Sequence, residues 1–303
     1  MNNKFLLATD YSNEVMNAER YAVQIAKETN STLALLHVYP IPITFPSEVI
    51  EYAKSIEELR QSEMKRLEQH RDELFRALNI NPEKLPCECI VREGSAGGQI
   101  CKEAEESHAD FIIVGTHGAS GFREAFLGSH SWDVIRKASV PVFAIPKDAL
   151  FTGIQNIVFG TAYREDDLSA LEFLTHFAKE FNAELTILHV TNYMLSKKFE
   201  KEMFEKFRSD VKEQFPYSKL EVRLLVNDAI AEGLNLYCSD NKTDLLAMSV
   251  PKTSLFEKIF LPALSMTRKM VFHTHIPLLA IPDSYHVEHS EKFVYSDDVG
   301  LLD

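Results

Sequence analysis

The amino-acid sequence predicts an α/β protein built from two tandem doubly wound domains, each with a five-stranded parallel sheet. Three observations support this fold class. The chain has 303 residues, which at ~150 residues per domain indicates two compact domains. Its two halves contain an internal repeat. In both halves nearly continuous apolar strands alternate with helical segments, which is the pattern of a parallel sheet covered on both faces.

The repeat begins at Phe5 and again at Ile157. The segment FLLATDYSNEVMNAERYAVQIAKETNSTLALLHVYP aligns without a gap with IVFGTAYREDDLSALEFLTHFAKEFNAELTILHVTN. Each copy predicts an apolar strand, a polar turn, an amphipathic helix ending near Asn30 or Asn182, and a second apolar strand. The two halves are therefore expected to share one fold.

A long helix is predicted after the second strand of each copy. In the second copy, six apolar residues at every fourth position predict one slightly drifting stripe on a helix: Leu195, Phe199, Met203, Phe207, Val211 and Phe215. The first copy has a looser stripe through Val49, Ala53, Ile56, Leu59, Met64, Leu67, Leu74 and Leu78. We expect both stripes to pack on a sheet rather than to form a cofactor site.

The remaining elements follow in the same order in both copies. CECIVREG and EVRLLVND predict third strands, and each is followed by a helix that ends before Asp110 or Asp244. The apolar strands FIIVG and LLAMS come next, and a last helix leads to PVFAIP or PLLAIP. We expect a first domain over residues 1–148, a second over 153–283, and an acidic tail over 284–303 that forms a flexible extension or a strap.

Composition limits the classes of function. Hydrophobic residues make up 45% of the chain and the formal net charge is −13, shared between two acidic halves, so a nucleic-acid backbone would be repelled. No stretch resembles a signal peptide or a membrane span. The sequence therefore predicts a soluble protein in the cytoplasm, without a nucleic-acid or membrane partner.

The cysteines do not have the spacing of a zinc site. Cys87 and Cys89 alternate along a predicted strand and point the same way, while Cys101 and Cys238 stand apart. In a reducing cytoplasm we interpret all four as small hydrophobic residues, with a metal or redox role as the alternative.

A glycine-rich segment carries the most specific chemistry. GTHGASGFREAFLGSHS runs from Gly115 to Ser131, where an apolar strand gives way to a loop and then a helix. Ligands of open α/β sheets bind at this end of the strands, and glycines let backbone amides approach a phosphate. Neither the P-loop motif nor the dinucleotide-binding fingerprint is present. The alternative is that these glycines only form turns.

The spacing Gly115-x2-Gly118-x9-Gly128-Ser129 resembles the nucleotide-binding motif of the universal stress protein family. ADFIIVGTHGASGFREAFLGS followed by VPVFAIP is similar to that family's most typical stretch, and VREGSAGGQI to the segment before it. The resemblance extends over about residues 3–146 and 155–282. It implies a tandem universal stress protein with a Rossmann-like fold, related to the adenine nucleotide alpha hydrolases.

The resemblance also implies a set of binding residues for ATP. Asp10 matches the family's acidic residue near the ribose and base, and Val38 matches a position lining the adenine pocket. The phosphate and ribose cradle is matched by Gly115, Gly118, Gly128 and Ser129, with His130 and Ser131 continuing the same turn.

Two positions depart from the family pattern. Ala8 stands where the family usually has a proline, and Ala119 stands where an arginine or lysine is common. The second change removes a phosphate contact, for which Arg123 is the nearest replacement charge.

The second copy lacks most of these residues. The counterparts of Asp10, Gly115 and Gly118 are Ala162, Ser249 and Lys252. Gly128 corresponds to Leu264 when two residues are inserted, which places Ser265 opposite Ser129, or to Pro262 without a gap. Because side chains replace glycine, we expect this domain not to bind ATP in the family's way.

Other residues are open to two interpretations. His273, His275, His286 and His289 suggest a metal site, but surface or capping roles are favoured. His37 and His189, at equivalent strand ends, are interpreted as hydrogen-bonded structural residues. Trp132 is expected to be buried, with a lid over the nucleotide as the alternative.

No catalytic triad, carboxylate pair or metal cluster stands out. The leading hypothesis is a cytoplasmic, stress-linked regulatory protein whose first domain binds ATP, with Mg²⁺ if ATP is cleaved. Its second domain would pair with the first through the last strands as a pseudo-dimer partner, and a further homodimer stays open. The alternatives are a slow ATPase or adenylyl-transfer enzyme, and a nucleotide-independent interaction or small-ligand module.

Overall fold

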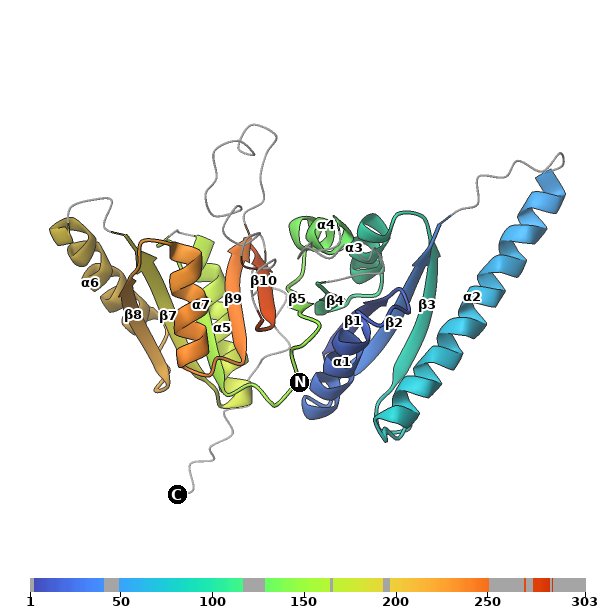
Figure 1. The fold of residues 1–303 in the computed structure, drawn as a ribbon, viewed down its shortest axis with the longest axis horizontal. Coiled ribbons are helices and arrows are strands. Elements are labelled where there is room, and N and C mark those ends of the chain that lie inside the picture. Colours follow the sequence, from blue (N-terminus) through green and yellow to red (C-terminus); the bar gives the residue numbers. More distant parts are fainter. Residues whose placement is uncertain are drawn as a thin grey trace, which may run out of the picture.

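The computed structural model describes residues 3–40, 49–116, 129–163, 166–192, 197–250, 270, 275–283 and 285. In these parts, ten strands form one continuous sheet, with helices on both of its faces (Figure 1). No helix among them is long and apolar enough to cross a lipid bilayer.

The N-terminal half contributes strands β1 (Lys4–Thr9), β2 (Thr32–Tyr39), β3 (Cys87–Glu93), β4 (Phe111–Gly115) and β5 (Val142–Ile145). Between them lie helices α1 (Met16–Glu28), α2 (Val49–Ala77), α3 (Ala96–Glu106) and α4 (Ser129–Lys137). The C-terminal half contributes β6 (Asn156–Gly160), β7 (Glu184–Thr191), β8 (Leu220–Val226), β9 (Leu245–Val250) and β10 (Leu278–Pro282). Its helices are α5 (Asp166–Phe181), α6 (Lys197–Gln214) and α7 (Ile230–Asp240).

The strand order is β3-β2-β1-β4-β5-β10-β9-β6-β7-β8. Each half is parallel and doubly wound, and its order reverses between β1 and β4 or between β6 and β9. The two halves meet where β5 and β10 run antiparallel, with Phe143 opposite Leu279. The predicted fold class and the predicted pairing of the last strands are both confirmed, whereas the exact domain boundaries stay a prediction.

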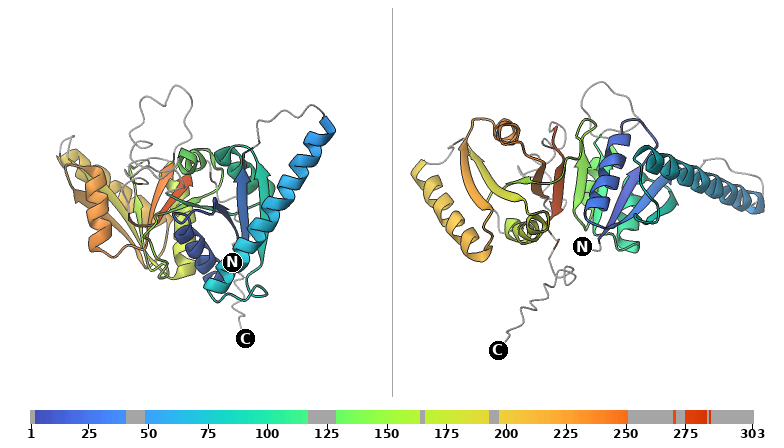
Figure 2. Two further views of the ribbon diagram at one scale, coloured as in Figure 1. Left: turned by 45° about the vertical axis from the view of Figure 1, so that its right-hand side comes forward. Right: turned by 90° about the horizontal axis from the view of Figure 1, so that it is seen from below.

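Helices cover the sheet in two layers (Figure 2). One buried cluster places α1, α2, α5 and α6 on the first face, and a second places α3, α4 and α7 on the other. Both clusters contain residues from the two halves. Burial therefore continues across the seam rather than stopping at it.

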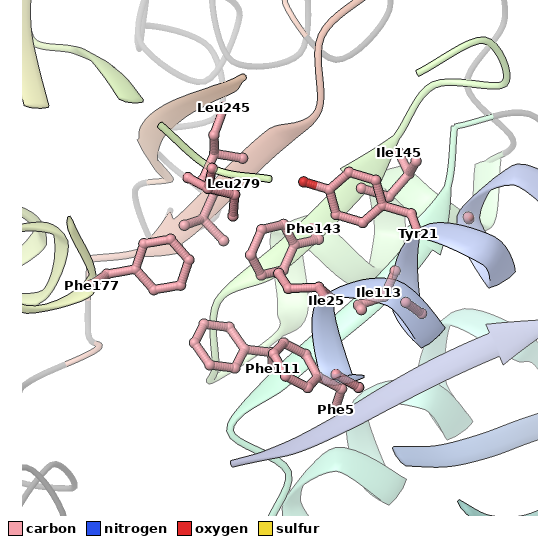
Figure 3. Close-up of a cluster of buried hydrophobic side chains, with 14 of the residues drawn as sticks. Phe5, Tyr21, Ile25, Phe111, Ile113, Phe143, Ile145, Phe177, Leu245 and Leu279 are labelled. Atoms are coloured by element: carbon pink, nitrogen blue, oxygen red, sulfur yellow. The ribbon is translucent and has the colours of Figure 1, made fainter. Parts of the chain in front are cut away.

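Aromatic rings fill the core at the seam (Figure 3). The Phe111 and Phe143 ring centroids lie 5.6 Å apart, and Phe177 from the C-terminal half lies 6.1 Å and 6.3 Å from them. Such pairs add to the free energy gained from burying apolar area. The halves thus share one core around these rings.

The ends of α1 and α5 confirm the predicted helix stops. Asn30 and Asn182 both have a φ of 51°, the left-handed conformation that asparagine tolerates better than most residues. In each case the next amide donates back into the last helical turn, from Ser31 to Ala26 and from Ala183 to Ala178. The repeat therefore extends to the capping geometry.

The predicted stripe on α6 is wrong in part. Phe199 is 50% exposed and Met203 is 41% exposed, whereas Phe204 and Val211 are buried. Four residues advance an α-helix slightly more than one turn, so a stripe with this spacing drifts about 40° per step and leaves the packed face. Leu195 lies outside the described residues, as does the expected tail except Tyr285, which contacts Phe173 edge to face.

Candidate functional site

A cavity of about 120 Å³ opens at the carboxyl ends of β1 and β4. This is the point where the strand order of the N-terminal half reverses, and ligands of open α/β sheets bind at such points. Its lining comes from β1, β2, β4, α3, α4 and the turn after β1: Ala8, Thr9, Asp10, Val15, Leu36, Val38, Ala96, Ile100, Val114, Gly115, His130 and Ser131.

The cavity brings together many of the predicted site residues. Those in its wall are Asp10, Val38, Gly115, His130 and Ser131. Ser129 is the first residue of α4, whereas Gly118 and Gly128 lie outside the described residues, as do Ala119 and Arg123. The structure thus gathers strand and helix residues from positions 10 to 131 around one space.

The cavity wall combines apolar and polar groups. Leu36, Val114 and Ile100 supply buried aliphatic surface. Asp10 and His130 are exposed and supply the titratable groups of the wall. This combination suits a ligand with a flat apolar part and a polar part.

A tight turn places Asp10 at the cavity. The Thr9 hydroxyl accepts the Tyr11 amide at 3.1 Å, and the Asp10 carboxylate accepts the Ser12 amide at 3.0 Å. Tyr11 has a φ of 61°, which is unusual for an aromatic residue. Its ring lies 4.3 Å from that of His37 and 4.1 Å from the Arg66 guanidinium. Packing around Tyr11 therefore holds the turn in this conformation.

Ser131 ties α4 to the end of β4. Its hydroxyl donates to the Gly115 carbonyl at 2.8 Å. The proton of this hydroxyl is therefore engaged within the protein, and toward a ligand Ser131 acts as an acceptor.

The two equivalent histidines are structural, as predicted. His37 Nδ1 lies 2.9 Å from the Thr9 carbonyl, and His189 Nδ1 lies 2.9 Å from the Thr161 carbonyl. In each ring, Nδ1–H donates to the carbonyl and joins two neighbouring strands. Burial lowers the pKa of both imidazoles.

Some lining residues were not singled out from the sequence. Thr9 directly precedes Asp10, and Ala96 and Ile100 lie within the VREGSAGGQI segment. Val15 precedes α1. The strand ends and the resemblance pointed to these segments, but only the fold shows which side chains face the cavity.

The same place in the C-terminal half holds a buried carboxylate. Asp167 is 2% exposed and accepts hydrogen bonds from the Thr161 hydroxyl at 2.7 Å, the Ala162 amide at 3.1 Å and the Ser249 hydroxyl at 2.9 Å. The ungapped repeat places Asp167 opposite Val15, and Ser249 corresponds to Gly115. Both positions of the first half line the cavity. We refer to this arrangement as the Asp167–Ser249 clasp.

Gly160, the counterpart of Ala8, lies beside Leu234 and Met248. An added Cβ would lie 3.5 Å from Leu234 and 3.7 Å from Met248, which is ordinary van der Waals contact. Lys252, Pro262, Leu264 and Ser265 lie outside the described residues.

Among the described residues, no group of three histidine, cysteine or acidic side chains has the arrangement of a metal site. Cys87 and Cys89 are half-buried on one face of β3, where they pack against the core as predicted. Burial raises the pKa of the Cys87 thiol to about 12. Trp132 is likewise half-buried against the second cluster.

His275 is exposed, while His273, His286 and His289 lie outside the described residues. Their expected surface roles therefore stay predictions.

Comparisons with known proteins point to one family. The sequence model of the universal stress protein family matches residues 1–146. Universal stress protein YxiE of Bacillus subtilis is 32% identical over 154 residues, which cover 48% of this chain and 99% of that protein. Universal stress protein MJ0531 of Methanocaldococcus jannaschii is 28% identical over 150 residues, covering 48% of this chain and 82% of that protein.

A solved structure extends the likeness to both halves. The crystal structure of a universal stress protein from Archaeoglobus fulgidus has a TM-score of 0.66, with 92% of this chain and 96% of that chain covered. At 19% sequence identity, this comparison concerns the fold alone.

Proposed function

The chain belongs to the universal stress protein family, and from that premise we propose that its N-terminal half binds ATP or a closely related adenine nucleotide. The C-terminal half is then a partner that completes the sheet without binding nucleotide in the same way. The expected role is that of a cytoplasmic regulatory protein of the stress response, with nucleotide occupancy as its signal.

The observation that carries the proposal is the convergence of Asp10, Val38, Gly115, His130 and Ser131 on one cavity. By resemblance, Asp10, Val38 and Gly115 match positions of the family's nucleotide site, and His130 and Ser131 continue its last turn. They come from the turn after β1, from β2, from β4 and from α4. These residues lie up to 121 positions apart in the sequence. If the glycines served only to form local turns, that requirement alone would not bring all of these residues to one cavity.

The lining suits an adenine nucleotide in its chemistry. The apolar wall around Leu36 and Val114 would take the base, and the Asp10 carboxylate would accept ribose hydroxyls. Gly115 opens the glycine segment, whose backbone amides would meet the phosphates. Because the net charge is −13, this local attraction must overcome an unfavourable overall field. Mg²⁺ would arrive with the phosphates, which are its usual ligands.

The Asp167–Ser249 clasp supports the unequal roles of the two halves. A buried carboxylate where the first half has Val15 would repel a phosphate, and Ser249 adds a side chain where Gly115 has none. The proposal therefore predicts one nucleotide per chain.

We favour binding over catalysis because the cavity lining combines aliphatic surface with a carboxylate and a hydroxyl, which suits recognition of a base and a ribose. A slow ATPase or adenylyl-transfer enzyme is the alternative outcome. Purified protein incubated with Mg²⁺ and ATP for hours should release intact ATP on denaturation if the protein is a binder.

Calorimetric titration of the full chain with ATP and Mg²⁺ tests the proposal. We expect one site per chain and about tenfold weaker binding in Asp10→Ala, because a hydrogen bond to a charged group is lost. Glu14→Ala removes an exposed carboxylate that does not line the cavity, and it should bind like the wild type. Two sites per chain, or equal affinity in both variants, would overturn the proposed assignment.

A further inference from the structure

A continuous series of contacts leads from the cavity to the long helix α2. Thr9, in the cavity wall, donates its hydroxyl proton to Glu19 of α1 at 2.5 Å. The same carboxylate oxygen lies 2.8 Å from Nε2 of His70 on α2. Glu19 is only 1% exposed, so this carboxylate depends on protein partners rather than on water.

We propose that Glu19 and His70 act as a positioning pair: the seating of α2 fixes the Thr9–Asp10–Tyr11 turn and thereby controls nucleotide binding in the cavity. The inference rests on the proposed function for its ligand, but the link between α2 and the turn exists without one. Coupling of this kind is reciprocal, so a bound nucleotide would also hold α2 in place.

The turn needs support from outside its own sequence. Tyr11 adopts a left-handed conformation that a non-glycine residue keeps only when its surroundings hold it. Three residues pack on its ring: His37 from β2, and Arg66 and His70 from α2, the last at 5.2 Å in an edge-to-face arrangement. Two of these three contacts would be lost if α2 moved away, and Asp10 lies directly between Thr9 and Tyr11.

The second half shows the same turn with a different anchor. Tyr163 has a φ of 58°, and its amide donates to the Thr161 hydroxyl at 3.0 Å. There the threonine donates to Asp167 of α5, and the counterpart of Glu19 is the buried Leu171. The first half therefore has a carboxylate at the position that contacts its long helix, whereas the second half has a leucine at that position.

The protonation state of His70 should change the strength of the contact between α2 and the turn. The groups facing it are Glu19 from α1, Tyr11 from the turn, and Glu73 and Arg66 from α2 itself. The hydrogen bond to Glu19 raises the pKa of His70 above its usual value. A charged His70 makes the stronger, charge-assisted bond. Raising the pH through its folded-state pKa removes that charge, so ATP affinity should fall as the solution becomes alkaline.

The experiment compares three variants of the full chain by amide hydrogen exchange without nucleotide. His70→Leu removes the donor, His70→Gln keeps a donor that does not titrate, and His108→Asn removes an exposed histidine elsewhere. Asparagine suits position 108, where φ is 52°. The Tyr11 and Ser12 amides, both hydrogen-bonded within the turn, are the reporters.

We expect about tenfold faster exchange of these amides in His70→Leu, with His70→Gln and His108→Asn close to the wild type. If His70→Leu and His108→Asn exchange alike, α2 does not hold the turn and the proposal fails. Should His70→Leu not fold, Glu19→Gln, which keeps an acceptor for Thr9, must still speed exchange in α2.

Binding of ATP with Mg²⁺ at pH 6 and pH 8 supplies the second readout. We expect about fivefold weaker binding in His70→Leu at pH 6, within the usual size of a coupling between sites. In His70→Gln the affinity should depend less on pH than in the wild type, because only the contribution of His70 is removed. A wild-type pH profile in His70→Gln would overturn the pH control. If the wild type does not bind ATP, the proposed function is rejected. The exchange experiment still tests whether α2 holds the turn, because it is done without nucleotide.

Discussion

At the residue scale, the two halves differ in the position of one buried carboxylate. In both, the threonine at the end of the first strand accepts a hydrogen bond from the backbone amide of a tyrosine with positive φ, and it donates one to a carboxylate of the following helix. In the first half that carboxylate is Glu19, behind the turn, and in the second it is Asp167, four residues nearer the helix start. One helical turn therefore moves the negative charge into the position that would face a ligand.

This comparison predicts an energetic coupling within the Asp167–Ser249 clasp. Asp167→Val alone removes the acceptor that two buried hydroxyls and an amide share, so we expect a loss of about 2–3 kcal/mol in the free energy of unfolding. Adding Ser249→Gly removes one of these hydroxyls and copies the first half at both positions. The double variant should therefore lose at least about 1 kcal/mol less than the sum of the single changes.

Urea unfolding of the wild type, both single variants and the double variant measures this coupling. Strict additivity would mean that Asp167 and Ser249 do not depend on each other. The sequence alone showed that Ser249 replaces a glycine, but it did not show this bond, because the partners lie 82 positions apart.

At the scale of elements, the sequence predicts best those helices and strands whose limits are set by local conformation or by a continuous apolar run. Helix ends at Asn30 and Asn182 follow from local conformation, and the strands follow from continuous apolar runs. The buried face of α6 cannot be predicted from its sequence alone, because the edge of the sheet determines how much of a long helix is covered. Phe199 and Phe204 illustrate the difference: they lie on one helix, but only Phe204 is buried.

These two phenylalanines provide a matched test. Phe204→Ser should lower the free energy of unfolding by about 3 kcal/mol, because it removes a buried aromatic ring. Phe199→Ser should change it by no more than about 0.5 kcal/mol, since the ring is 50% exposed. Both values come from urea unfolding followed by circular dichroism. Equal losses would show that Phe199 is covered by part of the chain outside the described residues.

At the scale of the whole molecule, the seam between the halves is a structural core. The β5–β10 pair closes what would otherwise be two sheet edges, and exposed edges favour association with other chains. Phe143 on β5 lies opposite Leu279 and beside the Phe177 ring. A repeat in the sequence predicts two similar units, yet their shared burial indicates that they unfold together.

The chain carries a natural probe in each half to test this. Trp132 is the only tryptophan and reports on the N-terminal half by fluorescence. Cys238 is 1% exposed on α7, so its reaction with a thiol reagent, located by mass spectrometry, reports on the C-terminal half. In urea both probes should show one coincident transition, because separating the halves would expose the rings at the seam.

Phe143→Ala should shift both transitions equally, by about 3–5 kcal/mol, although the substitution lies in the N-terminal half alone. Leu150→Ala, at a side chain that is 74% exposed near the seam, is the control and should leave both within about 0.5 kcal/mol. If Cys238 kept the wild-type midpoint in Phe143→Ala while Trp132 shifted, the halves would be independent folding units that only touch. If both transitions shift together, a substitution that destabilises the N-terminal half also destabilises α7 in the C-terminal half, on the other side of the seam.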